Sequence, residues 1–302
     1  MAEPPATDPT SFRAVIRHYY EENQVLYDLF WSDRATLSMG YGFWDGTTRR
    51  LADALLNQHR EIASRLHVRP HDVVLEAGCG VGGATVHLCA HHRARGIGIT
   101  LSPMQARRGR RNAERRRVGG RAAFAVADFT CAGLAEGAFT RLFACESVCH
   151  AVDKRAFLAE AYRLLCPGGR LLVCDGFLAR GDLSPDEERA YREWCLGWAL
   201  PGLDTIDGFT AALAAAGFAD VAFVDRTDAV LPSARRIRRL GMTLGVLVRG
   251  LHRLGLARPS QARHAVACLR QHDVLASGLA RYGVFTAVRP EVSGGDVGRS
   301  PD

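Results

Sequence analysis

Short apolar runs alternate with longer amphipathic segments from residue 72 onward. Amphipathic segments of helical length extend to His91 and over residues 103–117 and 154–165. The apolar runs, which have the length of buried strands, are VVLEA, RGIGIT, AAFAVA, RLFACE and RLLVCDGF. This alternation predicts an α/β fold in which helices cover both faces of a mostly parallel sheet.

Two later segments extend this sheet. AAAGFADVAFVD predicts a helix that ends at Gly217 and then a strand, and RYGVFTAVRP alternates well enough for a last strand. CPGG, just before RLLVCDGF, predicts a turn that leads into a strand. We therefore expect at least six strands.

Other segments surround the sheet. Residues 12–65 predict an N-terminal helical cover, and residues 66–290 form the main domain, with lid insertions at 178–204 and 229–280. Segments that pack over the carboxyl ends of a parallel sheet are where a lid and a substrate chamber are built.

The composition is that of an ordinary soluble globular enzyme, since 47% of the 302 residues are hydrophobic and 24% are charged. Nine cysteines without a CxxC pair suit a reducing compartment, so we expect a cytoplasmic protein. The most apolar stretch, residues 240–256, is interrupted by Arg249, His252 and Arg253, so no membrane span is expected. Residues 1–11 and 291–302 are expected to be a disordered leader and a disordered tail.

The formal net charge of +7 comes mostly from arginine, with dense clusters at residues 107–117 and 234–240. Either cluster has the charge to bind phosphate, but the arginines of the first are spread around a helix, which favours a solvated face. A nucleic-acid partner is disfavoured, because the aromatic residues lie in the lid segments rather than among the arginines. A small-molecule substrate is expected instead, and a homodimer is left open.

The segment VVLEAGCGVGGA predicts a ligand-binding loop between the first strand and the first helix. Gly78, Gly80 and Gly82 have no side chains, so backbone N–H groups can approach a ligand closely. The spacing G-x-G-x-G, with Glu76 just before the first glycine, differs from the dinucleotide fingerprint G-x-G-x-x-G. This form is typical of enzymes that use S-adenosylmethionine.

Seven motifs, in order along the chain, carry a resemblance to a known family: YYEENQVLYDLFW, LSMGYGFWD, LEAGCGVGG, GITLSPMQ, VADF, CESVCHAVDK and LCPGGRLLVCD. Over residues 18–290 the chain resembles class I S-adenosylmethionine-dependent methyltransferases. The subgroup includes sterol, tocopherol, prenyl-diphosphate and cyclopropane-fatty-acid enzymes. The resemblance implies a Rossmann-like methyltransferase sheet whose last strand is antiparallel.

The resemblance also implies a set of cofactor-binding residues. Asp128 would meet the adenine amino group beside Phe129, and Tyr20 with Ser38 would cover the methionine carboxylate, with Tyr19 as the alternative to Tyr20. No acidic residue follows the second strand, so Thr100 and Gln105 would replace it at the ribose. The remaining implied cofactor residues are Glu76, Gly78, Gly80 and Leu101.

Glu146 ends an apolar run and is followed by Cys149 and His150. The resemblance places Glu146 at the carboxyl end of the fourth strand, where its carboxylate could stabilise a carbocation and then accept a proton, and sterol enzymes have a similar acidic residue before Cys-His. The alternatives are a structural cap for Glu146 and an ordinary hydrogen-bonded residue for His150. No metal site is expected, because Cys145, Cys149 and His150 without further ligands are a weak signal.

An aromatic chamber would suit methylation of an alkene, because aromatic faces stabilise a passing cation. The candidate substrate residues are Trp31, Tyr41, Trp44, Trp194 and Trp198. Arginines near both the cover and the late insertion suggest a prenyl diphosphate such as isopentenyl or geranyl diphosphate, with Mg²⁺ bridging its oxygens. The alternative acceptors are a sterol, a tocopherol-like phenol or a small amine.

Overall fold

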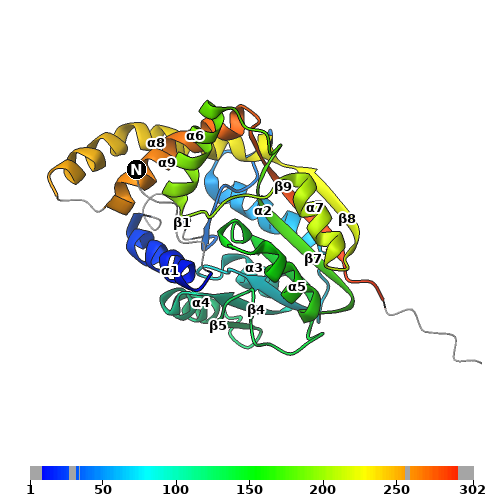
Figure 1. Ribbon diagram of the computed structural model, residues 1–302. Coiled ribbons are helices and arrows are strands. Elements are labelled where there is room, and N and C mark those ends of the chain that lie inside the picture. Colours follow the sequence, from blue (N-terminus) through cyan, green and yellow to red (C-terminus); the bar gives the residue numbers. More distant parts are fainter. Residues whose placement is uncertain (1–8, 27–31, 34, 256–258, 292–302) are drawn as a thin grey trace, which may run out of the picture.

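The computed structural model describes residues 9–26, 32–33, 35–255 and 259–291. A seven-stranded sheet forms its centre (Figure 1). The strands, in the order in which they lie side by side, are β5 (Ala122–Val126), β4 (Arg95–Thr100), β3 (Val73–Ala77), β6 (Phe139–Cys145), β7 (Leu165–Leu178), β9 (Ala280–Val288) and β8 (Ala219–Asp225).

The five strands from β5 to β7 pair in parallel, and β9 inserts antiparallel between β7 and β8. The predicted Rossmann-like methyltransferase sheet with an antiparallel last strand is confirmed, with one strand beyond the minimum of six. The turn predicted at CPGG is wrong in detail, because β7 already begins at Leu165 and its pairing with β6 shifts register there.

Helices cover both faces of this sheet, so neighbouring side chains of a central strand are both buried. Phe143 of β6 packs in a core cluster with Ile62, whereas Leu142 packs in a second cluster with Phe157 and Phe209. The helices closest to the sheet are α2 (Leu51–Arg65), α3 (Gly83–His91), α4 (Pro103–Arg115), α5 (Lys154–Leu164) and α7 (Ile206–Ala215). Burial on both faces explains why these strands are continuous apolar runs.

Side-chain caps fix where several helices begin. Ser102 accepts a hydrogen bond from the Gln105 backbone and starts α4, and Asp153 accepts one from the Ala156 backbone and starts α5. Each cap satisfies a backbone N–H that has no partner within its helix. The cap at Ser102 also fixes this residue just beyond the end of β4, at the edge of the sheet where the carboxyl ends of the parallel strands lie.

The cover and the lid lie over the carboxyl ends of the parallel strands. Their elements are α1 (Pro9–Leu26), β1 (Ser32–Asp33), β2 (Ser38–Met39), the short helix η2 (Val148–His150), α6 (Pro185–Trp198), α8 (Thr227–Arg253) and α9 (Pro259–Ala276). The segment 12–65, expected to be helical, thus also contains a small antiparallel sheet of β1 and β2. Helices α6, α8 and α9 lie together above the sheet (Figure 1).

Within the described part of the chain, every helix is either too short or too polar to cross a membrane.

Candidate active site

A cavity of about 220 Å³ lies at the carboxyl ends of β3, β4, β6 and β7. One end is lined by the glycine loop after β3 and by residues 100–102 after β4. The other end is lined by Glu146 and by apolar side chains of the lid, among them Trp194, Leu203 and Leu275. This is the position at which open α/β sheets bind ligands.

The loop from β3 to α3 requires its glycines. Gly78 has a φ of +78°, and a Cβ added there would lie 2.4 Å from the Cβ of Ser147. Gly80 has a φ of +51°, and its backbone lines the cavity. The loop therefore presents bare backbone to a ligand, as the sequence predicts.

Glu76, at the end of β3, is a buried carboxylate that lines the cavity. Its Oε2 accepts hydrogen bonds from the backbone N–H and the hydroxyl of Thr85. Burial nevertheless raises the pKa of Glu76 to about 7. A cationic group that entered the cavity beside Glu76 would favour its ionised form.

Neutral polar groups follow β4. The Thr100 hydroxyl donates to Gln105 Oε1 at 2.8 Å and accepts from the Ser102 backbone at 3.2 Å. Thr100, Leu101, Ser102 and Gln105 all line the cavity. Ser102 was not among the predicted site residues, although a serine just after a strand and directly before a proline is a recognisable helix cap.

Asp128 and Phe129 lie in the loop after β5. Phe129 lines the cavity, and its ring packs edge-on against Phe157. The Asp128 carboxylate accepts from the backbone and hydroxyl of Thr130 and forms an ion pair with Arg13 of α1. Asp128 is not part of the cavity wall, so its predicted contact with adenine stays a prediction.

Tyr20 and His150 are hydrogen-bonded beside the cavity, which both line. His150 Nδ1 lies 3.1 Å from the carbonyl oxygen of Ala199, which can only accept, so Nδ1 carries the proton. His150 Nε2 therefore accepts from the Tyr20 hydroxyl at 2.8 Å. The neighbouring Tyr19 points elsewhere, to His264, and does not line the cavity.

Glu146 directly follows β6 and does not have the backbone conformation of a strand. Its φ is +53°, an unusual conformation for a residue with a side chain, and its backbone N–H still donates to the Cys174 carbonyl at 2.8 Å. The Glu146 carboxylate lines the cavity. Oε1 accepts from the Tyr282 hydroxyl at 2.8 Å, the Tyr41 backbone at 3.1 Å and Gln58 Nε2 at 3.4 Å.

Burial raises the pKa of Glu146 to about 7, although these three hydrogen bonds act in the opposite direction. A carboxyl group with a pKa in this range can both take up and release a proton near neutral pH. The bond from the Tyr41 backbone means that Glu146 also has the capping contact considered as the alternative.

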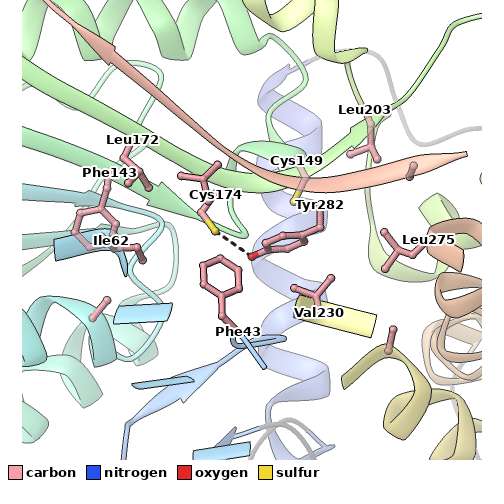
Figure 2. Packing of buried hydrophobic residues seen from close by; sticks show 14 of the residues in the cluster. Phe43, Ile62, Phe143, Cys149, Leu172, Cys174, Leu203, Val230, Leu275 and Tyr282 are labelled. Atoms are coloured by element: carbon pink, nitrogen blue, oxygen red, sulfur yellow. Dashed lines mark hydrogen bonds between the residues drawn. The ribbon is translucent and has the colours of Figure 1, made fainter. Parts of the chain in front are cut away.

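Three further residues near the site were not predicted from the sequence. Gln58 and His59 come from α2, and Tyr282 comes from β9. Gln58 Nε2 donates to the Tyr282 hydroxyl at 2.9 Å, and His59 Nε2 lies 2.8 Å from the Ser38 hydroxyl. Figure 2 shows the Tyr282 ring reaching from β9 towards Cys174 of β7, whose sulfur lies 3.3 Å from its hydroxyl. A polar pair, Gln58-His59, on the apolar face of a helix was the available signal.

The predicted aromatic residues divide into three groups. Tyr41, Trp194 and Trp198 line the cavity. Trp44 does not: its indole N–H donates to the Ser233 hydroxyl at 2.8 Å, and the residue lines a separate surface hollow, so its contact with a substrate stays a prediction. Trp31 lies outside the described residues.

The arginines proposed for a diphosphate are mostly remote. Among the described residues, Arg17 is the one arginine or lysine that lines the cavity. Arg13 pairs with Asp128, and Arg49 and Arg50 bind Gly46 and Asp53 near the surface. The arginines expected from the late insertion, which lie in α8, are likewise absent from the cavity wall: Arg235, Arg236, Arg238 and Arg239.

Cys145 and Cys149 line the cavity as well. Burial raises the pKa of the Cys149 thiol, and a hydrogen bond to Cys174 together with burial raises the pKa of Cys145. Both are therefore protonated and weakly nucleophilic. The described residues contain no group of three or more His, Cys, Asp or Glu side chains that could hold a metal ion.

Comparisons with known proteins agree with this geometry. Residues 75–173 match a family described as a methyltransferase domain. The chloroplastic tocopherol O-methyltransferase of Arabidopsis thaliana is 27% identical over 94% of this chain and 84% of its own length.

Two solved structures share the fold. One is the geranyl diphosphate C-methyltransferase of Streptomyces coelicolor A3(2), in complex with Mg²⁺, geranyl diphosphate and S-adenosyl-L-homocysteine, with a TM-score of 0.71, 20% identity and coverage of 95% of this chain and 100% of that one. The other is the cyclopropane synthase MmaA2 of Mycobacterium tuberculosis, with a TM-score of 0.77, 16% identity and coverage of 91% and 98%. The matched domain and the relative, together with the glycine loop and the buried Glu76, support a class I S-adenosylmethionine-dependent methyltransferase similar to the sterol and prenyl-diphosphate subgroup, and the two solved structures show that the fold is shared.

Proposed function

We propose that the protein methylates a hydroxyl oxygen of a lipophilic, phenol-type molecule, with Glu146 as the general base. The observation that carries the proposal is a buried carboxylate with a pKa of about 7 in a cavity otherwise lined largely by apolar and aromatic side chains. A base with a pKa near the working pH is the most effective, because it is available and still accepts a proton readily.

The glycine-loop end of the cavity suits S-adenosylmethionine. The Glu76 carboxylate would hold the cofactor's ammonium group, and the backbone at Gly78 and Gly80 and the polar groups of Thr100 and Gln105 would hold its remaining polar atoms. When bound, the cofactor supplies a methyl group already activated on a sulfonium sulfur. The enzyme's own residues must therefore align the acceptor and remove its proton.

Glu146 is held for proton removal. Tyr282, Gln58 and the Tyr41 backbone all bond Oε1, which leaves Oε2 without a hydrogen bond from the described residues. In the proposed reaction the acceptor O–H donates to the Glu146 carboxylate. As the acceptor oxygen bonds the methyl carbon, its O–H bond and the bond from that carbon to the sulfonium sulfur would both break, which leaves the proton on Glu146 and a neutral thioether as the departing group. The proton then leaves to solvent when the product departs.

A prenyl diphosphate, which we expected from the sequence, has less support. Its several negative charges would enter a cavity in which Arg17 is the one described cationic side chain. Burying an anion with so little compensation is costly. A neutral phenol needs no such site and no Mg²⁺, and the tocopherol relative, aligned over 94% of this chain, acts on a molecule of that kind by its name.

Methylation of an alkene carbon is the second candidate. Tyr41, Trp194 and Trp198 offer aromatic faces to a carbocation, and Glu146 could take the proton that such a cation must lose. The geranyl diphosphate enzyme shares the fold and carries out that class of reaction by its name. The two candidates differ in the atom that receives the methyl group.

The test supplies methyl-labelled S-adenosylmethionine together with γ-tocopherol, a sterol, or geranyl or isopentenyl diphosphate, each with Mg²⁺ or with EDTA. We expect label in the phenol, on oxygen, equally with and without Mg²⁺. The Glu146→Gln variant should bind the cofactor normally and lose about 100-fold or more in turnover. Mg²⁺-dependent labelling of a diphosphate, with the phenol unlabelled, would overturn the proposal.

A further inference from the structure

The segment from residue 229 to residue 272 contains nine arginines and no aspartate or glutamate. The chain has 32 acidic residues, so all of them lie elsewhere. Most of this segment forms α8 and α9, which pack against each other and together are called the basic arm below. The basic arm extends beyond the sheet in Figure 1, in yellow to orange. Such a concentration of one charge points to an acidic partner.

Several arginines of the basic arm are free to meet that partner. Arg238 pairs with Asp273, and Arg270 pairs with Glu193 of α6. In contrast, Arg235, Arg239 and Arg263 are exposed, and none of their side chains bonds or pairs with a described residue. Arg235 and Arg239 are four residues apart on α8, so they project from the same side of the helix.

Exposed apolar side chains accompany these charges. Among the described residues, the large hydrophobic side chains that are exposed are Val15, Val126, Met242 and Leu254. Met242 of α8 and Leu254, which directly follows the last residue of α8, are 53% and 74% exposed. Met242 follows Arg239 by three residues, so it continues the side of α8 that carries the two free arginines.

The same helices form the roof of the cavity. Ile237 lies between the arginines of α8, is 3% exposed and lines the cavity, and Leu275 of α9 lines it too. The basic arm therefore has an inner face towards the acceptor end of the cavity and an outer face with free arginines and apolar side chains.

We propose that the outer face of the basic arm docks on an anionic phospholipid surface. Arginine attracts acidic headgroups, and exposed Met242 and Leu254 can enter the boundary between headgroups and acyl chains, which is the behaviour of a basic amphipathic helix. A nucleic acid would match the charge alone and would leave these two side chains without a role. The docking itself is inferred from the charge and the exposure of these side chains. That the acceptor would pass from the bilayer into the cavity rests in addition on the proposed function.

The test is co-sedimentation of the full-length protein with vesicles, without cofactor or acceptor. We expect binding to phosphatidylcholine mixed with phosphatidylglycerol and not to phosphatidylcholine alone. Raising the salt concentration should weaken binding, because the Debye length is only about 10 Å at 0.1 M salt. Replacing Arg235 and Arg239 together by glutamine should weaken partitioning about 25-fold, at about fivefold for each arginine.

The matched control is the double variant Arg107→Gln and Arg111→Gln on α4. These two arginines are also exposed and four residues apart, so the change in net charge and the spacing are the same. Met242→Ser should weaken vesicle binding without changing net charge. The proposal fails if both double variants bind anionic vesicles equally. It also fails if the protein binds RNA or sediments as oligomers alone while leaving the vesicles unbound.

Discussion

A Cβ atom added to Gly40 would lie 2.9 Å from Oε1 of Glu146 and 3.1 Å from Oε2. The Glu146 side chain cannot easily move away, because Tyr282, Gln58 and the Tyr41 backbone are hydrogen-bonded to its carboxylate. Gly40 thus leaves the space in which the proposed base sits.

Gly40→Ala should therefore displace the Glu146 carboxylate and lower turnover by about tenfold or more, with cofactor affinity little changed. Turnover and calorimetric affinity for S-adenosylhomocysteine are the measurements. Gly46→Ala is the control, because a Cβ at Gly46 meets no atom within 4 Å. Equal turnover in the two variants would show that the spacing at Gly40 does not matter for the reaction.

Tyr282→Phe should move the acid limb of the pH–rate profile to higher pH. The Tyr282 hydroxyl donates to Glu146 and lowers its pKa, so without this bond the pKa of Glu146 rises further above its usual range. Since the ionised form is the base, activity should be lost at a higher pH, by about one unit. Rates measured from pH 5 to pH 9 test this, with Tyr162→Phe, remote from the cavity, as the control. An unmoved profile with a uniformly lower rate would assign Tyr282 a packing role.

The two buried carboxyl groups should make the cofactor-free protein less stable as the pH rises. Glu76 and Glu146 each have a pKa of about 7 in the folded protein, against 4.5 ordinarily. Between these pH values the folded state keeps a proton that the unfolded state has lost, so increasing pH favours unfolding, by up to roughly 3 kcal/mol for each group.

Glu76→Gln and Glu146→Gln should each flatten this decline between pH 5 and pH 8, as followed by denaturant unfolding. Burial lowers the pKa of His59 to about 3 and that of His87 to about 4, which acts in the opposite direction as the pH falls. The parent and both variants keep His59 and His87, so the contribution of these histidines cancels when the free energy of unfolding of each variant is subtracted from that of the parent. Parallel curves for parent and variants would mean that these carboxyl groups are ionised in the folded protein throughout.

Arg13→Gln should speed cofactor release. Arg13 ties α1 to Asp128 and donates to the Thr130 hydroxyl, so it holds the cover against the loop after β5. An ion pair of this exposure contributes up to about 1 kcal/mol, which corresponds to about a fivefold faster dissociation. Stopped-flow fluorescence with S-adenosylhomocysteine measures this rate, and Arg111→Gln on α4 is the control. If both variants release the cofactor at the parent rate, α1 does not limit its exit.

The cofactor end of the site was largely predictable, because its residues belong to single loops directly after strands. The run VVLEA and the glycines after it identify a strand, a turn and the start of a helix within about ten residues. Local spacing along the chain is therefore enough to predict this part of the site. Glu146 was predictable for the same reason, as a carboxylate at the end of an apolar run. Its positive φ and its elevated pKa were not, because they depend on Tyr41, Gln58 and Tyr282 from distant parts of the chain.

The acceptor end was less predictable. Periodicity indicates that Trp44 and Trp194 are both largely buried, but it does not tell which ring faces a cavity and which packs elsewhere. Trp44 turns to Ser233 and Trp194 lines the cavity, and only tertiary packing decides between them. The arginines of α8 were misplaced in the same way, because a run of like charges does not reveal which side of its helix faces solvent.

The insertion of β9 between β7 and β8 has a consequence for the order in which the site is assembled during protein synthesis. The glycine loop and Glu146 leave the ribosome long before Tyr282 does, since synthesis proceeds from the N-terminus. A nascent chain can thus form its five parallel strands while the hydroxyl that tunes Glu146 is still absent. The surroundings that set the pKa of Glu146 are therefore completed only by the last strand, after the half of the sheet that carries the glycine loop has been made.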